Sequence, residues 1–191
     1  MQWTWPEEFG EEKFVVMFGG LHIELAALKT LGDLLQDSGW TSALIQANIA
    51  SPCTADSFIK ASNISRTRHA HQVTAASLFV LMKTQYEAYI ETENTRIGPE
   101  MNIEMWCATR RNESPMFMFW SMILQLELTV LTFIRSLRER NFTLYMDSLL
   151  ALVPYFFALD RSNYARWLPV HINDMLLLKM KAPDVASEFE K

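Results

Sequence analysis

A long apolar segment in the second half of the chain constrains the fold most. Residues 115–134 read PMFMFWSMILQLELTVLTFI, and a cluster of arginines follows directly. About 20 apolar residues are enough to cross a bilayer. However, Gln125 and Glu127 fall in the middle, where a carboxylate costs about 3 kcal/mol in a membrane. We therefore expect the buried helix of a water-soluble domain, in which Glu127 is either paired in the core or structurally important.

The composition indicates a globular, helix-rich chain. Of its 191 residues, 50% are hydrophobic and 20% are charged, which is typical of one domain with a proper core. The net charge of -5 argues against a uniformly basic nucleic-acid-binding surface but leaves room for local basic patches. Two cysteines, Cys53 and Cys107, are too few for a disulfide framework and show no metal-ligand spacing. We expect free thiols in a reducing compartment and no metal site.

The N-terminus predicts a location inside the cell. It reads MQWTWPEEFGEEK and has neither a basic region nor an apolar stretch of the kind that opens a secretory signal. We therefore expect a nuclear or cytoplasmic protein that is not secreted.

The distribution of apolar residues predicts a mainly α fold of one domain, residues 1–191. The apolar run Phe14–Phe18, bounded by Gly19 and Gly20, predicts one short strand. A lone strand needs partners, either weak strands elsewhere, a second copy, or chain outside this sequence. Residues 94–114 lack periodicity and predict an internal loop. The remaining periodic segments predict helices in a bundle-like array, near 21–37, 40–49, 54–61, 65–93, 115–140, 142–159 and 169–178.

Several polar residues in apolar surroundings predict a core network. His22 and Glu24 follow the glycines at a helix start, but residues two apart on a helix point in different directions and cannot bind one metal together. Asp160, Asn163 and Arg166 lie between two apolar segments, where polar groups often fix a helix junction. Asp160 is expected to cap the turn that follows it. We group these five with Glu127 as polar core residues.

Two basic groups are candidates for contact with nucleic acid or an acidic partner. Lys60, Arg66, Arg68 and His69, together with His71, surround a predicted helix start, where positive charge opposes the helix dipole. Such a cluster is either retained for phosphate contact or forms a solvated face. Arg110 and Arg111 make the second group. No serine-hydrolase, metalloprotease or phosphate-loop motif is present, so we predict no catalytic residue and no cofactor.

Three segments carry a resemblance to a known group of proteins. They are FVVMFGGLHIELAALKTLGDLLQDSGW, SRTRHAHQVTAASLF and FFALDRSNYARWLPVHINDM. They resemble uncharacterised, multi-copy proteins of invertebrate and fish genomes that look like mobile-element products with a degenerate ribonuclease-H-like, transposase-type core. The resemblance implies that the helices are an insertion in that core and that the acidic ligands of two divalent ions lie outside this chain.

Three hypotheses for function follow from the sequence. The first is a fragment derived from a mobile element, without a catalytic centre of its own, which retains nucleic-acid contact. The second is a helical scaffold or protein-interaction module, which associates with a partner, with itself or with flanking chain. A membrane-associated protein is the third and least favoured.

Overall fold

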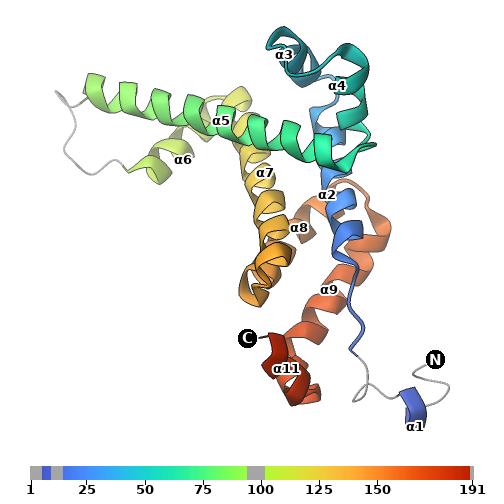
Figure 1. Ribbon diagram of the computed structural model, residues 1–191. Coiled ribbons are helices and arrows are strands. Elements are labelled where there is room, and N and C mark those ends of the chain that lie inside the picture. The colour runs from blue at the N-terminus through green and yellow to red at the C-terminus, as the bar shows by residue number, and fades with distance from the viewer. Residues whose placement is uncertain (1–5, 10–14, 94–101, 190–191) are drawn as a thin grey trace. The chain divides into compact units, whose positions relative to one another are not determined.

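The protein is helical throughout the part that the structure describes. The computed structural model describes residues 6–9, 15–93 and 102–189, and 84% of these are helical, with no strand among them (Figure 1). The helices are α1 (Pro6–Phe9), α2 (Gly20–Leu35), α3 (Trp40–Gln46), α4 (Pro52–Ile59), α5 (Ile64–Glu93), α6 (Ile103–Glu113), α7 (Pro115–Glu139), α8 (Phe142–Ala158), α9 (Ser162–Leu176), α10 (Leu178–Lys181) and α11 (Pro183–Phe189).

The predicted N-terminal strand is wrong. Residues 15–18 are irregular chain, and Phe14 lies outside the described residues. Val15 and Phe18 pack on helices instead of pairing with strands, whereas Val16 and Met17 between them are exposed. Val15 packs against a small cluster that contains Leu178, and the ring of Phe18 meets that of His171 edge-on at 5.3 Å. No sheet is present in the described ranges, so the ribonuclease-H-like core is wrong as well.

The predicted loop over residues 94–114 is also corrected. Residues 94–101 lie outside the described part, but Ile103–Glu113 forms helix α6. Asn102 caps this helix by accepting a hydrogen bond from the backbone N–H of Met105 at 2.8 Å. Trp106 is buried on one side of the helix. Only two residues of α6, Trp106 and Cys107, are buried. Two adjacent buried residues do not produce a helical periodicity in the sequence.

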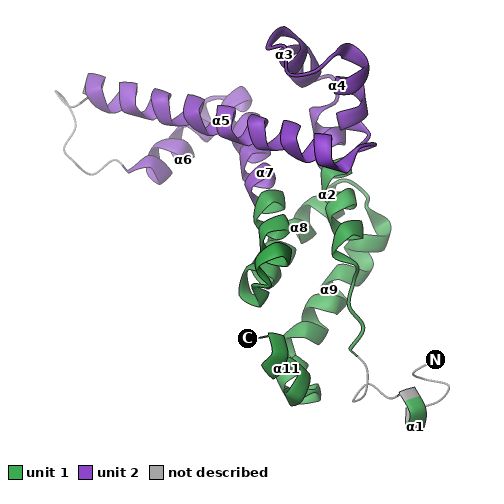
Figure 2. Cartoon of the chain, in the orientation of Figure 1, with its two compact units in different colours: residues 1–30, 129–191 green, residues 31–128 purple. Residues whose placement is uncertain are grey.

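The chain divides into two compact units (Figure 2). Unit 1 comprises residues 1–30 and 129–191, and unit 2 comprises residues 31–128. Each unit therefore contains a part of α2 and a part of α7.

Unit 1 is built around α8 and α9, which pack against each other. The interface is apolar, with Leu149 and Leu152 on α8 and Leu168 and Ile172 on α9 all buried. Helix α8 runs through Pro154 without a break. Nor does a helix begin at Pro169, which lies inside α9. A proline removes one backbone hydrogen bond, and we attribute the continuity of both helices to this packing.

Asp160 has a different role from the predicted cap. Its φ of 50° lies in the left-handed region, which aspartate enters more readily than most residues. Arg161 occupies the N-cap position of α9 and makes no capping hydrogen bond through its side chain. Asp160 therefore serves the tight turn between α8 and α9.

Unit 2 has its own apolar core. Residues from α2, α3, α4, α5 and α7 form one buried cluster, which consists of Leu35, Trp40, Leu44, Phe58, Ala70 and Ile123. The loop before α3 turns at Gly39, where φ is 86°. The next residue, Trp40, is 4% exposed, so this turn places the largest ring of the cluster in the core.

Candidate functional site

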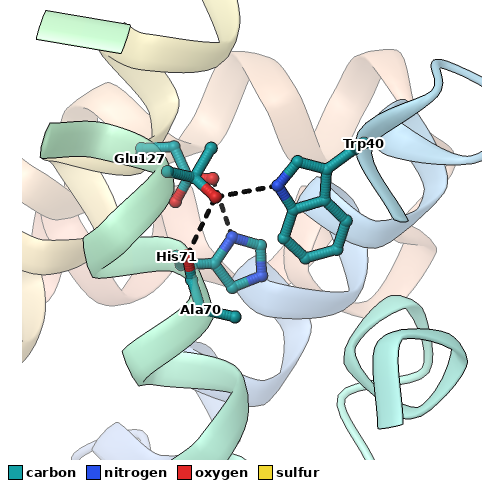
Figure 3. A network of polar contacts seen from close by, with 5 residues as sticks. Trp40, Ala70, His71 and Glu127 are labelled. Atoms are coloured by element: carbon teal, nitrogen blue, oxygen red, sulfur yellow. Dashed lines mark hydrogen bonds and ion pairs between the residues drawn. The ribbon is translucent and has the colours of Figure 1, made fainter. Parts of the chain in front are cut away.

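A buried histidine–glutamate pair lies inside unit 2 (Figure 3). Nδ1 of His71 on α5 lies 2.7 Å from Oε1 of Glu127 on α7, and the two side chains are 1% and 0% exposed. Burial raises the pKa of the Glu127 carboxyl, because a charge is poorly solvated there, and the neighbouring His71 partly opposes this shift. Glu127 is therefore buried and paired, and His71, expected in a basic surface cluster, lies in the core.

An aromatic ring covers this pair. The indole of Trp40 stacks on the imidazole of His71 with the ring centroids 5.2 Å apart and 17° between planes. Its Nε1–H donates to Oγ1 of Thr74 at 2.8 Å, and the Thr74 hydroxyl donates to the carbonyl of Ala70 at 2.8 Å (Figure 3). Two contacts thus hold Trp40 in one orientation. We call His71, Glu127, Trp40 and Thr74 the buried network.

His71 and Glu127, at the centre of the buried network, are closed to solvent and position other side chains instead of contacting a substrate. Nε2 of His71, Oε2 of Glu127 and Oγ1 of Thr67 are buried and have no hydrogen-bond partner among the described protein atoms. Because His71 and Glu127 are almost fully buried, they cannot reach a molecule outside the core.

An apolar groove of about 640 Å³ lies next to the buried network in unit 2. Trp40 and Thr74 belong to both. The walls come from α3, α5, α6, α7 and the turn before α3. Most of its large lining side chains are apolar, among them Trp40, Leu44, Leu78, Leu81, Met82, Trp106, Phe117 and Trp120. A concave apolar site of this size is typical of ligand or partner binding.

Charge is scarce in the groove. Among the described residues that line it, Arg110 alone is charged. Its Nη1 lies 2.9 Å from Oε2 of Glu113, but both side chains are about half exposed and the pair contributes little. The adjacent Arg111 donates from Nε to Oγ of Ser121, a lining residue, at 3.0 Å. The groove therefore carries positive charge at its α6 end.

The predicted nucleic-acid-binding residues fall into two separate groups. Lys60, Arg66 and His69 are exposed near the junction of α4 and α5, and Arg68 is half-buried. Arg110 and Arg111 lie on α6, which contacts the far part of α5 where Tyr86 meets Trp106. At 1.5 Å per residue, the two groups are roughly 30 Å apart along α5. They make no continuous basic surface.

The other predicted core residues are not brought together. His22 is exposed and Glu24 is buried on α2, whereas Asp160, Asn163 and Arg166 are all exposed. Two other residues of the same segment, Tyr164 and Arg161, make hydrogen bonds to α2 within unit 1. Tyr164 donates from its hydroxyl to the carbonyl of His22 at 3.0 Å, and Arg161 donates from Nε to Oγ1 of Thr30 at 3.2 Å.

One signal could have located the buried network. Thr67, His71 and Thr74 recur at spacings of four and three, which places them on one side of a helix. All three are buried. Polar residues that share one side of a helix predict hydrogen bonds within the protein core. The arginines next to them in the sequence led instead to the prediction of a basic surface cluster.

Unit 1 contains a second buried polar pair. The hydroxyl of Tyr145 lies 2.8 Å from Nε2 of His171, and both residues are buried. Burial raises the pKa of Tyr145 to about 12, so the phenol keeps its proton and can donate it to the imidazole. Burial lowers the pKa of His171, and Asp174 partly opposes this shift. The pair joins α8 to α9.

We expect unit 1 to lose stability in mild acid because of His171. Its pKa in the folded chain lies below the ordinary value of 6.5. As the pH falls below 6.5, the unfolded chain takes up a proton that the folded chain resists, so the free energy of unfolding falls. Urea titrations between pH 7.5 and pH 5 should show a smaller loss for His171→Gln than for the wild type. The exposed His69→Gln is the control, and equal losses in all three proteins would contradict the assignment.

The longest apolar helix bears on the membrane hypothesis. In the described part, α7 is the one helix long and apolar enough to cross a bilayer, with a mean hydropathy of 1.7. In that segment 44% of the residues are buried inside the protein, and the buried helix of a soluble core passes the same test. A single such helix is weak evidence for a membrane span.

The fold and the groove define a helical protein with an apolar groove, and the comparisons with known proteins name no function. Residues 100–191 match a family model described as a domain of unknown function (DUF8702). This range contains helices α6 to α11. No curated protein and no solved structure matches the chain.

Proposed function

We propose that the chain is a helical protein-interaction module that holds an apolar segment of a partner in the groove of unit 2. The groove itself carries the proposal, because its apolar lining includes three tryptophans together with the solvent-exposed side chains of Leu81 and Met116. Tryptophan is enriched among the residues that dominate binding energy at protein interfaces. Trp40 is fixed in orientation by its hydrogen bond to Thr74 and by its stacking on His71, so part of the binding surface is preorganised.

Nucleic-acid contact and a mobile-element origin remain predictions. The basic side chains occur in two separate groups, one around the start of α5 and one on α6, and the net charge is -5. Nucleic-acid binding usually relies on a continuous basic surface, and two separated positive patches on an acidic chain do not provide one. The groove therefore supports an apolar partner more strongly than the basic residues support nucleic acid.

Filling the groove should abolish binding of an apolar probe. Ser77 lines the groove and Ala76, the preceding residue on α5, is exposed outside it. The probe is anilinonaphthalene sulfonate, whose fluorescence rises in apolar surroundings. We expect Ser77→Trp to weaken probe binding at least tenfold, because the indole occupies the groove, and Ala76→Trp to leave it unchanged.

The comparison of neighbouring positions controls for adding an aromatic ring to α5. Circular dichroism should show that both variants keep the helical content of the wild type. Equal probe binding by Ser77→Trp and the wild type would contradict the assignment of the groove as the binding site.

A further inference from the structure

We infer that the occupant of the groove is an amphipathic helix of about three turns that places an acidic side chain beside Arg110. This inference rests on the proposed function, and it names the class of partner. The length, the backbone chemistry and the charge of the groove each support it.

The α5 side of the groove sets the length of the occupant. Val73, Ser77, Leu81 and Gln85 line it at intervals of four residues, and their neighbours Thr74, Leu78 and Met82 complete the stripe. The stripe covers three helical turns, or roughly 18 Å at 1.5 Å per residue. A partner helix that presents apolar residues at intervals of three and four matches a surface of this length.

Backbone chemistry favours a helix over an extended peptide. The groove is lined largely by helices, whose backbone groups are bonded within each helix, and no strand edge occurs in the described residues. An extended peptide would therefore bury backbone N–H and C=O groups without partners, which is costly in an apolar site. A helix satisfies these groups internally and can lie on apolar side chains at no such cost.

Side-chain size provides room for the occupant. Small residues, among them Ala43, Ala47 and Ser77, alternate with the large rings, so a helix can approach closely between them. Met82 and Met116 also line the groove, and unbranched methionine side chains adapt to the shape of a partner.

Charge sets the orientation of the occupant. Arg110 is the one charged residue among the described lining residues, and its half-exposed pair with Glu113 is readily exchanged for another carboxylate. A glutamate on the partner helix near α6 would complete the apolar contacts with an ion pair. A lysine in the same place would face a like charge.

Designed peptides test the inference on the full chain. The first is a 14-residue peptide with leucines along one helical face and one glutamate at its end; three others carry glutamine or lysine in place of that glutamate, or a central proline. We expect the glutamate peptide to bind roughly fivefold more tightly than the glutamine peptide. The proline peptide should bind at least tenfold more weakly, because a central proline disrupts the helix.

Arg110→Gln should remove the preference for glutamate over glutamine. Arg135→Gln is the matched control, because Arg135 is also an exposed arginine paired with a glutamate, in unit 1. Fluorescence anisotropy of labelled peptides gives each dissociation constant.

Each other outcome overturns the inference in a distinguishable way. If the dye binds the groove but the proline peptide binds as well as the others, the occupant is not a helix and the proposed function stands. If Arg110→Gln keeps the preference, the charge assignment is wrong. If sizing chromatography shows a dimer that Ser77→Trp dissociates, the occupant is a second copy. If Ser77→Trp changes neither dye nor peptide binding, the proposed function fails too.

Discussion

Replacing Gly32 with alanine is expected to lower the free energy of unfolding by about 3 kcal/mol. Gly32 lies on α2 where this helix crosses the end of α4 within unit 2. An added Cβ would collide with the carbonyl oxygen of Ile59 and lie 2.9 Å from its carbonyl carbon. These are backbone atoms, so no side-chain rotation can relieve the clash, and the two helices must move apart.

Urea denaturation followed by far-ultraviolet circular dichroism measures this effect. Lys29→Ala, at an exposed position of the same helix, should change the free energy of unfolding by less than about 0.5 kcal/mol. Gly39→Ala provides a second comparison, since its φ is 86° but its Cβ would meet open space. We expect it to cost about 1 kcal/mol through backbone strain alone. A Gly32→Ala variant as stable as Lys29→Ala would refute the close contact between α2 and α4.

Replacing Glu127 with leucine is expected to cost about 3 kcal/mol. Leucine fills much of the space of the glutamate but accepts no hydrogen bond. Nδ1 of His71, 2.7 Å from Glu127 in the wild type, would be left buried without a partner. Leaving one member of a buried polar pair unsatisfied costs more than the intact pair contributes. The same urea titration measures the loss.

A double variant separates the pair from simple packing. His71→Leu together with Glu127→Leu removes both polar groups, so no orphaned partner remains. We expect the double variant to be more stable than Glu127→Leu alone, because replacing both partners with apolar groups is often close to neutral. If the losses of the two single variants add up in the double variant, the two side chains are not energetically coupled.

Helix positions were the most predictable feature of the fold. The periodicity of 21–37, 65–93 and 142–159 marked α2, α5 and α8 to within a few residues of their observed bounds. Boundaries with special backbone geometry were less predictable. Thr41 is of a residue type that favours the N-cap position, but α3 begins one residue earlier, at Trp40, after Gly39 in a left-handed conformation. Turn geometry of this kind depends on how the following ring is packed.

The error at residues 14–18 has a simple physical cause. A short apolar run next to glycines fits a buried strand and also fits irregular chain whose side chains pack on helices. Hydrophobicity measures the preference for burial but not the partner that supplies it. In unit 1, Val15 packs against the cluster that contains Leu178, and Phe18 packs against His171.

By itself the sequence determined that Glu127 lies on an apolar helix and needs a partner, because that conclusion depends on local spacing and on the cost of an isolated charge. Only the tertiary structure decided that the partner is His71, which lies 56 positions earlier in the chain. The groove was likewise out of reach of the sequence, since segments from four helices line it. Periodicity reports which face of a helix is buried, whereas contacts between distant helices depend on how those faces pack together in three dimensions.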